Sequence, residues 1–230
     1  MNHADHVNLL RPAGLAPGGT WADLGAGSGA FTLALRELIG PEAEIYAVDK
    51  DRGRLDELEQ AYRARFGDPA RLHLLPADFT RPLAGSTALS AGLPPLDGIV
   101  MANSLHFFRD KETVLRHVRT FLKPGGSLVP PRGDALLLPP RGDALLLPPH
   151  GDALLLLPPR GDALLLPPRG DALLLLVEYN VDRGNPWVPR PLSFETFRAL
   201  APRAGFREPR LLAKHPSRFL REFYSALATG

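Results

Sequence analysis

The amino-acid sequence predicts an α/β fold, a doubly wound and mostly parallel sheet with helices on both faces. Two observations predict it. Strand-like and helix-like apolar patterns alternate along the chain, which is typical of parallel strands joined by right-handed crossovers. The loops with unusual residues all follow predicted strands, where open α/β sheets bind their ligands. The length of 230 residues and the 44% hydrophobic content suffice for one core.

The predicted elements follow one another as strand and helix from residue 20 onward. The apolar residues of each helix recur three and four positions apart, so that they share one face, and each strand is a short apolar run. The elements are strands over residues 20–24, 44–48, 71–75, 96–102 and 172–180, helices with apolar faces over residues 31–39, 55–66, 114–122 and 193–204, and two late strand-like stretches near Leu211 and Phe219.

A tandem repeat interrupts this pattern between residues 130 and 175. Five copies of PPRGDALLL follow one another, the third with His150 in place of Arg and with one extra Leu, and 16 of the 46 residues are Leu. Joining residues 123–129 directly to residues 176–180 gives KPGGSLVLVEYN, a turn followed by one apolar strand. The repeat is therefore interpreted as an in-frame expansion inside an older domain.

The repeat insertion precedes or lies within the predicted fifth strand. Because its last copy continues into that strand, the earlier copies are expected to loop out at the strand's amino end, opposite the ligand loops. Residues 1–129 and 176–230 then form a single domain, with residues 130–175 as the inserted segment. Three adjacent leucines in each copy need burial or a partner, so the alternative function is a module whose repeats mediate self-association or protein interaction.

The loops after the predicted strands carry the candidate ligand-binding residues. Gly25, Gly27 and Gly29 allow close approach to the backbone at the start of a helix, whose free N–H groups favour a polar or anionic group. Asp49 follows the second strand, 24 residues after Gly25, where it can accept both hydroxyls of a ribose. The glycine loop alone does not choose a cofactor, because Gly25, Gly27 and Ala30 also satisfy the dinucleotide pattern G-x-G-x-x-A.

Five motifs, taken in order, narrow the choice of cofactor. This set resembles the class I S-adenosylmethionine-dependent methyltransferases, which have a Rossmann-like fold, and the resemblance covers about 160 residues. It implies an enzyme that transfers a methyl group from S-adenosylmethionine. The motifs are DLGAGSG at residues 23–29, AVD at 47–49, PADF at 76–79, DGIVMAN at 97–103 and LKPGG at 122–126.

The resemblance also implies a role for each motif residue, and each role has a simpler alternative. Asp78 could instead cap its loop, Asp49 could be a solvated strand end, Phe79 could belong to the core and Asn103 could be a turn residue. The implied cofactor-binding residues are Asp23, Gly25, Ala26, Gly27, Ser28 and Gly29 at the methionine part, Asp49 with the adjacent Lys50 at the ribose, Asp78 and Phe79 at the adenine, and Asn103 at the rim of the methyl-transfer site.

The candidate general base is His106, three residues after Asn103. An ordinary histidine titrates near neutral pH, so it suits an acceptor that must lose a proton; the alternative is a packed or surface histidine. Residues 103–106, NSLH, differ from the NPPY form of enzymes that methylate exocyclic or amide nitrogens, and no aromatic and basic groove suggests RNA or DNA, so a small molecule is the default acceptor. Further candidates for the acceptor pocket are Tyr179, Asn180, Asp182 and Trp187 and, from an N-terminal helix folded over the cofactor, His3, Asp5 and His6.

Composition and charge exclude several classes of function. The 27 basic and 25 acidic residues leave a formal net charge of +2 with no dense basic run, so no nucleic-acid partner is expected. The absence of Cys excludes disulfides and thiolate metal sites, and no metal site is predicted. The longest aliphatic run, residues 173–177, is too short to span a membrane, and the first residues lack a secretion signal. The sequence therefore predicts a cytoplasmic protein.

Overall fold

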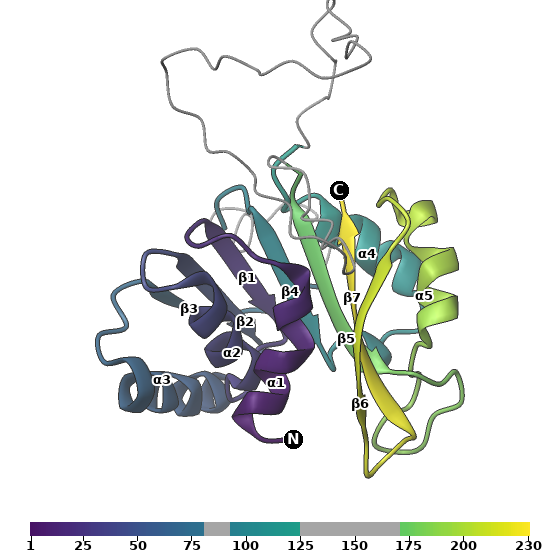
Figure 1. Cartoon of the computed structure of the whole chain (residues 1–230), viewed down its shortest axis with the longest axis horizontal. Coiled ribbons are helices and arrows are strands. Elements are labelled where there is room, and N and C mark those ends of the chain that lie inside the picture. Colours follow the sequence, from purple (N-terminus) through teal and green to yellow (C-terminus); the bar gives the residue numbers. More distant parts are fainter. Residues whose placement is uncertain (81–92, 125–170) are drawn as a thin grey trace, which may run out of the picture. The chain divides into compact units, whose positions relative to one another are not determined.

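The computed structural model describes residues 1–80, 93–124 and 171–230, which form a seven-stranded sheet with helices on both faces (Figure 1). The strand order is β3-β2-β1-β4-β5-β7-β6. The first five strands are parallel, and β7 lies antiparallel between β5 and β6. The strands are β1 (Thr20–Leu24), β2 (Glu44–Asp49), β3 (Leu72–Pro76), β4 (Gly98–Ala102), β5 (Leu173–Tyr179), β6 (Arg210–Pro216) and β7 (Glu222–Thr229).

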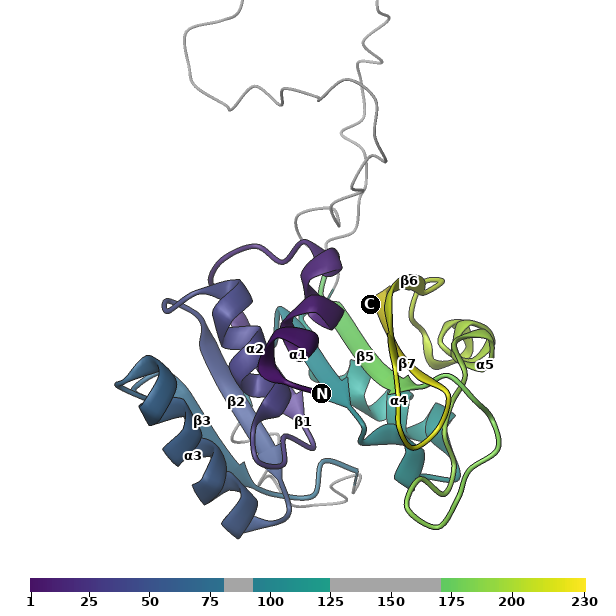
Figure 2. The ribbon, with the colours of Figure 1, turned by 60° about the horizontal axis from the view of Figure 1, so that its bottom comes forward.

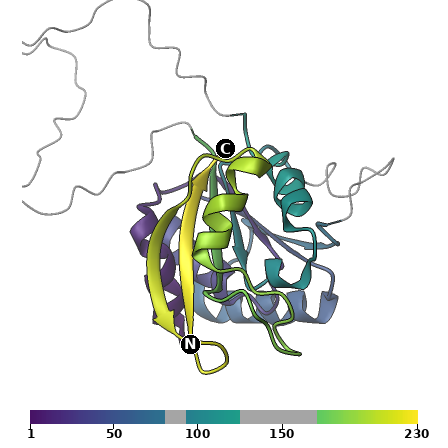
Figure 3. The ribbon, with the colours of Figure 1, turned by 90° about the vertical axis from the view of Figure 1, so that its right-hand side faces the viewer.

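The helices divide between the two faces of the sheet, as Figures 2 and 3 show. Buried side chains of α1, α2 and α3 pack with one set of strand residues, and those of α4 and α5 pack with the alternate set. This doubly wound arrangement confirms the predicted fold class. The helices are α1 (His3–Leu10), α2 (Ala30–Ile39), α3 (Arg52–Phe66), α4 (Lys111–Arg119) and α5 (Phe194–Leu200), with short 3-10 turns η1 (Arg11–Ala13), η2 (Leu105–Phe107) and η3 (Pro202–Ala204).

Side-chain caps fix where most of these helices begin. Asn2 and Asp5 form a reciprocal capping box at the start of α1. The side chains of Asp51, Asp110 and Ser193 accept hydrogen bonds from backbone N–H groups in the first turns of α3, α4 and α5. Helix α2 has no side-chain cap, because it begins at the glycine loop. Its first N–H groups are therefore left for the cavity described below.

The fifth strand begins inside the last copy of the repeat, as predicted. All seven residues of β5 are buried, because β4 and β7 flank it and helices cover both faces. Three adjacent leucines are tolerated there for that reason. Residue 173 pairs with Gly98 at the amino end of β4, and the Lys123 N–H donates to the carbonyl of Leu96. Repeat residues 130–170 lie outside the described residues, so the predicted domain boundaries and the role of the repeat stay predictions.

The structure differs from the sequence prediction at several boundaries. Phe219 lies in the turn between β6 and β7, and the last strand begins at Glu222. Helix α4 ends at Arg119, and Leu122 beyond it bridges to Leu96 instead of extending the helix. No helix in the described part of the chain is long and apolar enough to cross a membrane.

Candidate active site

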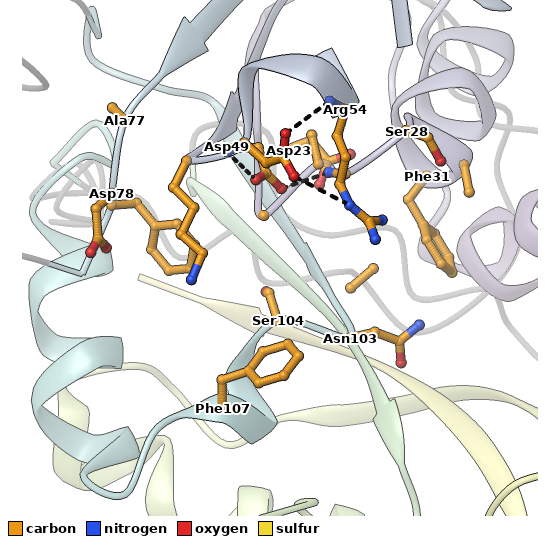
Figure 4. A pocket seen from close by; sticks show the side chains of 18 of the residues that line it. Asp23, Ser28, Phe31, Asp49, Arg54, Ala77, Asp78, Asn103, Ser104 and Phe107 are labelled. Atoms are coloured by element: carbon orange, nitrogen blue, oxygen red, sulfur yellow. Dashed lines mark hydrogen bonds and ion pairs between the residues drawn. The ribbon is translucent and has the colours of Figure 1, made fainter. Parts of the chain in front are cut away.

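A cavity of about 710 Å³ opens at the carboxyl ends of the central strands, next to the first turn of α2. Figure 4 shows Asp23, Asp49 and Arg54 on one side of it and Asn103, Ser104 and Phe107 on the other. Volumes of this order are usual for cofactor sites. The lining residues are His6, Asp23, Gly25, Ala26, Gly27, Ser28, Ala30, Phe31, Asp49, Lys50, Asp51, Arg54, Ala77, Asp78, Phe79, Ala102, Asn103, Ser104, Phe107 and Phe108.

The glycine loop is folded onto the end of β2. The N–H groups of Gly25 and Ala26 donate to the carbonyl of Val48 at 2.8 and 3.1 Å. Gly25 has a φ of +83°, and a Cβ atom added there would lie 2.6 Å from Cβ of Ser104, so only glycine fits. This close packing brings the end of β1 against the loop after β4.

Gly29 has a packing role that the sequence does not reveal, and its contact with the cofactor stays a prediction. It does not line the cavity. Its φ is +89°, and an added Cβ would lie 2.5 Å from Cγ of Leu58, so Gly29 allows α2 to pack closely against α3. A glycine pattern in sequence does not distinguish close approach to a ligand from close approach of two helices.

The Asp49 side chain is held by two backbone N–H groups at the edge of the cavity. Its Oδ2 accepts a hydrogen bond from the Gly27 N–H at 2.8 Å, and its Oδ1 accepts one from the Asp51 N–H at 2.9 Å. Each carboxylate oxygen has a second lone pair available to a ligand hydroxyl. The side chain is thus fixed in place at the end of β2 and can still bind a ligand.

Asp23 is a buried carboxyl group that faces the cavity. Its side chain is about 1% exposed, and Oγ1 of Thr32 donates to its Oδ2 at 2.7 Å. Burial raises the pKa of Asp23 to about 7, the hydrogen bond from Thr32 opposes this rise, and the charge of Asp49 adds to it. The free protein therefore holds Asp23 partly protonated at neutral pH.

Asp78 and Phe79 have the local roles that the sequence left open as alternatives, and their contact with the adenine stays a prediction. Both residues line the cavity. Asp78 also caps its loop, because its Oδ1 accepts hydrogen bonds from the N–H and the hydroxyl of Thr80 at 3.0 and 2.6 Å. Phe79 is also part of the apolar core and lies edge-on to Phe108, with ring centroids 6.0 Å apart. Their local role does not prevent contact with a ligand.

The loop after β4 presents two polar atoms that have no protein partner among the described residues. Asn103 has a φ of +53°, which Asn tolerates, and its N–H donates to the carbonyl of Val177. Its Oδ1 atom and the Oγ atom of Ser104 are buried and make no hydrogen bond there, although both residues line the cavity. Other buried polar atoms of the described chain are also unpaired, but these two belong to residues that line the cavity and can therefore contact a ligand.

His106 lies behind the cavity lining. It is 3% exposed, and its Nδ1 is 3.0 Å from Oε2 of Glu178. Glu178 is fully buried and also accepts hydrogen bonds from the N–H groups of Leu105, His106 and Tyr179. This pair fixes η2 onto the end of β5. The structure thus favours the packed alternative for His106, and its role as a general base stays a prediction.

The other predicted acceptor residues are mostly engaged elsewhere. His6 lines the cavity, with its ring 4.8 Å from that of Phe31. The remaining six do not line it. His3 pairs with Glu37, Asp5 caps α1, and Tyr179 packs with Val188 and Phe223. Asn180 donates a hydrogen bond to Glu222, Asp182 accepts one from Ser193, and Trp187 is exposed.

Several residues in the cavity lining were not predicted from the sequence. Ser104 belongs to residues 103–106, the loop that the sequence singled out, and Phe107 follows it directly, so their position was the available signal. Arg54 and Phe31 gave no signal, because the first is typical of a solvated helix surface and the second of an apolar helix face. No group of three or more His, Asp or Glu side chains in the described residues could hold a metal ion.

Comparisons with known proteins agree with this geometry. Residues 22–128 match the family model of a methyltransferase domain, and no curated protein matches the sequence. This match points to a methyltransferase domain over residues 22–128, and the fold agrees with it.

Solved structures of low sequence identity share the fold. An S-adenosylmethionine-dependent methyltransferase from Aquifex aeolicus is 16% identical, with a TM-score of 0.57 over 98% of this chain and 89% of that one. Magnesium protoporphyrin IX methyltransferase from Synechocystis, with bound S-adenosylmethionine, is 12% identical, with a TM-score of 0.56 over 99% and 77%. The YcgJ protein of Bacillus subtilis is 12% identical, with a TM-score of 0.61 over 99% and 98%.

Proposed function

We propose that this chain is an enzyme that transfers the methyl group of S-adenosylmethionine to a small-molecule acceptor. The observation that carries the proposal is the cavity at the carboxyl ends of β1, β2 and β4. The glycine loop, Asp49 and Asn103 meet there, and Oδ1 of Asn103 has no hydrogen-bond partner among the described residues. A solved structure of the same fold is named for a small acceptor, magnesium protoporphyrin IX, which supports the class of acceptor.

The cavity fits this cofactor in charge and in shape. S-adenosylmethionine has a net positive charge, and carboxylates of Asp23, Asp49 and Asp78 line the cavity. Gly25 and Gly27 leave the backbone open to a ligand, and the first turn of α2 offers N–H groups to its carboxylate. The bound cofactor supplies an activated methyl group on a sulfonium that is its own leaving group.

The residues of this chain would then mainly bind, orient and exclude water. Asp49, held by two backbone N–H groups, would accept the ribose hydroxyls, and Asp78 would accept the adenine amino group beside the ring of Phe79. Asp23, with Ser28, Ala26 and the flanking glycines, would face the methionine part. Lys50 and Asn103 complete the proposed cofactor-binding set, Asn103 at the rim where the methyl group is transferred.

His106 is the proposed general base for an acceptor that must lose a proton. Glu178 holds Nδ1 of His106, so the proton would go to Nε2. Because the imidazole is 3% exposed, this requires η2 to open toward the cavity. Full turnover of a His106→Ala variant on the true acceptor would exclude this role.

Calorimetric titration tests the proposed cofactor. We expect S-adenosylmethionine to bind with micromolar affinity and NAD not to bind. Asp49→Ala should weaken binding by about tenfold or more, since it removes charged hydrogen bonds to the ribose. Asp56→Asn, an exposed carboxylate on α3, is the matched control and should leave affinity unchanged. Binding of NAD alone, or equal affinities in both variants, would refute the proposal.

Self-association through the repeats stays a separate prediction. Light scattering on the full chain and on a chain that lacks residues 130–170 would test it, because β5 keeps its residues in the shorter chain. Identical numbers of protomers would exclude it.

A further inference from the structure

We propose that the acceptor is an aromatic molecule with an acidic group, bound by exposed aromatic side chains and arginines at the mouth of the cavity. This inference rests on the proposed function, because it concerns the acceptor side of the same site. Three observations support it. They are the exposed aromatic rings, the cations that form no close ion pair with a described residue, and the contacts between their loops.

The exposed aromatic residues gather on three loops at one edge of the sheet. Phe107 in η2 is 57% exposed, Trp187 in the loop after β5 is 77% exposed, and Phe219 in the turn between β6 and β7 is 70% exposed. They are the only exposed aromatic residues in the described part of the chain. All three loops lie at the end of the sheet where β5 ends and β7 begins. Phe107 also lines the cavity, so this surface continues into the proposed methyl-transfer site.

Specific contacts hold these loops against one another. The Arg190 guanidinium donates from Nη1 to the carbonyl of Phe107 at 3.4 Å, which ties the loop after β5 to η2. Val188 of the same loop is buried against Tyr179 and Phe223, and Leu220 of the β6–β7 turn packs on this small cluster. The loop after β5 therefore touches both η2 and the β6–β7 turn, and we infer that the three aromatic side chains form one surface.

Trp187 lies in a turn whose backbone is fixed by side-chain hydrogen bonds. The Asn185 side chain accepts hydrogen bonds from the N–H groups of Trp187 and Val188, at 3.0 and 2.8 Å. The backbone is fixed while the indole ring makes no ring contact among the described residues. A large ring that is ordered but not buried is typical of a surface that binds another molecule.

The same loops carry an excess of positive charge. Residues 103–111, 181–192 and 217–221 contain six Lys or Arg residues and two Asp residues. Both Asp side chains are engaged, Asp110 as the cap of α4 and Asp182 with Ser193. None of the six cations forms a close ion pair with a described residue, although the charge of Lys111 interacts with Glu178 and Asp182 and that of Arg221 with Glu222. The six are Arg109, Lys111, Arg183, Arg190, Arg218 and Arg221.

The cavity lining and the basic loops differ in charge. Four carboxyl groups line the cavity beside the two cations Lys50 and Arg54, which suits the positively charged S-adenosylmethionine. The basic loops, which meet the lining at Phe107, suit an anion. An acidic acceptor would be attracted both by the arginines and by the sulfonium to which it must come close. A nucleic acid fits less well, because Asp49, Asp51 and Asp78 interrupt any continuous basic track across the mouth.

Binding of two matched probes tests the proposal. We would titrate the full chain, saturated with S-adenosylhomocysteine, with 2-naphthoate and with its neutral analogue 2-naphthamide, by calorimetry at low ionic strength. The carboxylate should bind about tenfold more tightly than the amide, and salt at about 0.5 M should remove most of this difference. Binding of S-adenosylhomocysteine, measured first, separates failure of this proposal from failure of the proposed function.

Variants locate the binding surface. Trp187→Ala should weaken both probes, whereas Leu211→Ala, which removes an exposed apolar side chain of β6, should weaken neither. Arg183→Gln should weaken only the carboxylate, by about threefold, as expected for an exposed charge. Arg190→Gln also removes the hydrogen bond to Phe107, so it should weaken both probes. Arg190→Lys should keep most of the affinity. Arg119→Gln, which removes the same charge from the end of α4, is the control.

Several results would overturn the proposal. These are equal affinity for the two probes, no binding of 2-naphthoate at millimolar concentration to protein that binds S-adenosylhomocysteine, and equal effects of Arg183→Gln and Arg119→Gln. Displacement of the probe by a single-stranded oligoribonucleotide at micromolar concentration would identify a nucleic-acid surface and would equally overturn it.

Discussion

Replacing Asp23 by Asn should change how the stability of this protein depends on pH. Burial raises the pKa of Asp23 from 3.8 to about 7 in the folded chain, and the unfolded chain restores the lower value. Between these two values the folded state keeps a proton that the unfolded state has lost. Stability therefore falls as pH rises from about 4 to about 7 and is independent of this group outside that window.

The size of the effect follows from the shift. Each pH unit inside the window changes the free energy of unfolding by about 1.4 kcal/mol, so Asp23 alone removes about 4 kcal/mol across it. The amide introduced by Asp23→Asn would be neutral at every pH and could still accept the hydrogen bond from Thr32. Between about pH 5 and about pH 8 the stability of the wild type should thus fall by about 3 kcal/mol relative to Asp23→Asn.

Urea unfolding of both proteins at several pH values measures this difference. The cofactor gives a second measurement, because an ammonium group beside Asp23 favours its ionised form. Affinity for S-adenosylmethionine should drop about tenfold from about pH 8 to about pH 6 in the wild type, and less in Asp23→Asn. His6 also lines the cavity, and burial lowers its pKa, so the comparison between the two proteins isolates Asp23. A stability difference that does not vary with pH would refute the reasoning.

Three other substitutions have expected outcomes. Glu178→Gln should lower the free energy of unfolding, measured with urea, by about 3 kcal/mol, because a buried amide would face backbone N–H donors. Glu195→Gln, at an exposed side chain, should lower it by less than about 0.5 kcal/mol. Gly25→Ala should abolish measurable cofactor binding in calorimetry through its clash with the loop after β4; Gly67→Ala, at a similar φ of +81° but in open space, should only lower stability by about 1 kcal/mol. Arg36→Met should lower the thermal midpoint without changing cofactor affinity, since this buried guanidinium donates to two backbone carbonyls and does not line the cavity.

The central part of the fold was predictable because its signals are local. The glycine loop between residues 25 and 29 joins a strand to a helix with apolar residues on one face, and both lie where the sequence predicts them. The position of β7 between β5 and β6 was not predictable, because pairing of distant strands leaves no periodic mark. Phe219 is typical of a strand by its residue type, yet it lies in a turn before β7.

In the candidate site, too, residues marked by a local motif were predictable, and contacts between distant parts of the sequence were not. Asp49 and Asn103 were identified from their positions after strands, and both line the cavity. Gly29 obeys the same pattern but packs against Leu58, a helix contact that no local motif reveals. The partner of His106 is Glu178, 72 residues further along the chain, so its burial could not be anticipated.

The start of β5 within the last copy of the repeat has an evolutionary consequence. The strand takes its first leucines from whichever copy comes last, and four of the five copies end in the same Ala-Leu-Leu-Leu, the third having one further Leu. A whole unit can therefore be gained or lost by slippage during DNA replication without altering a single side chain of the sheet. The reading frame and the strand register with Gly98 are both preserved. The seven-stranded sheet therefore does not by itself fix the number of repeat copies.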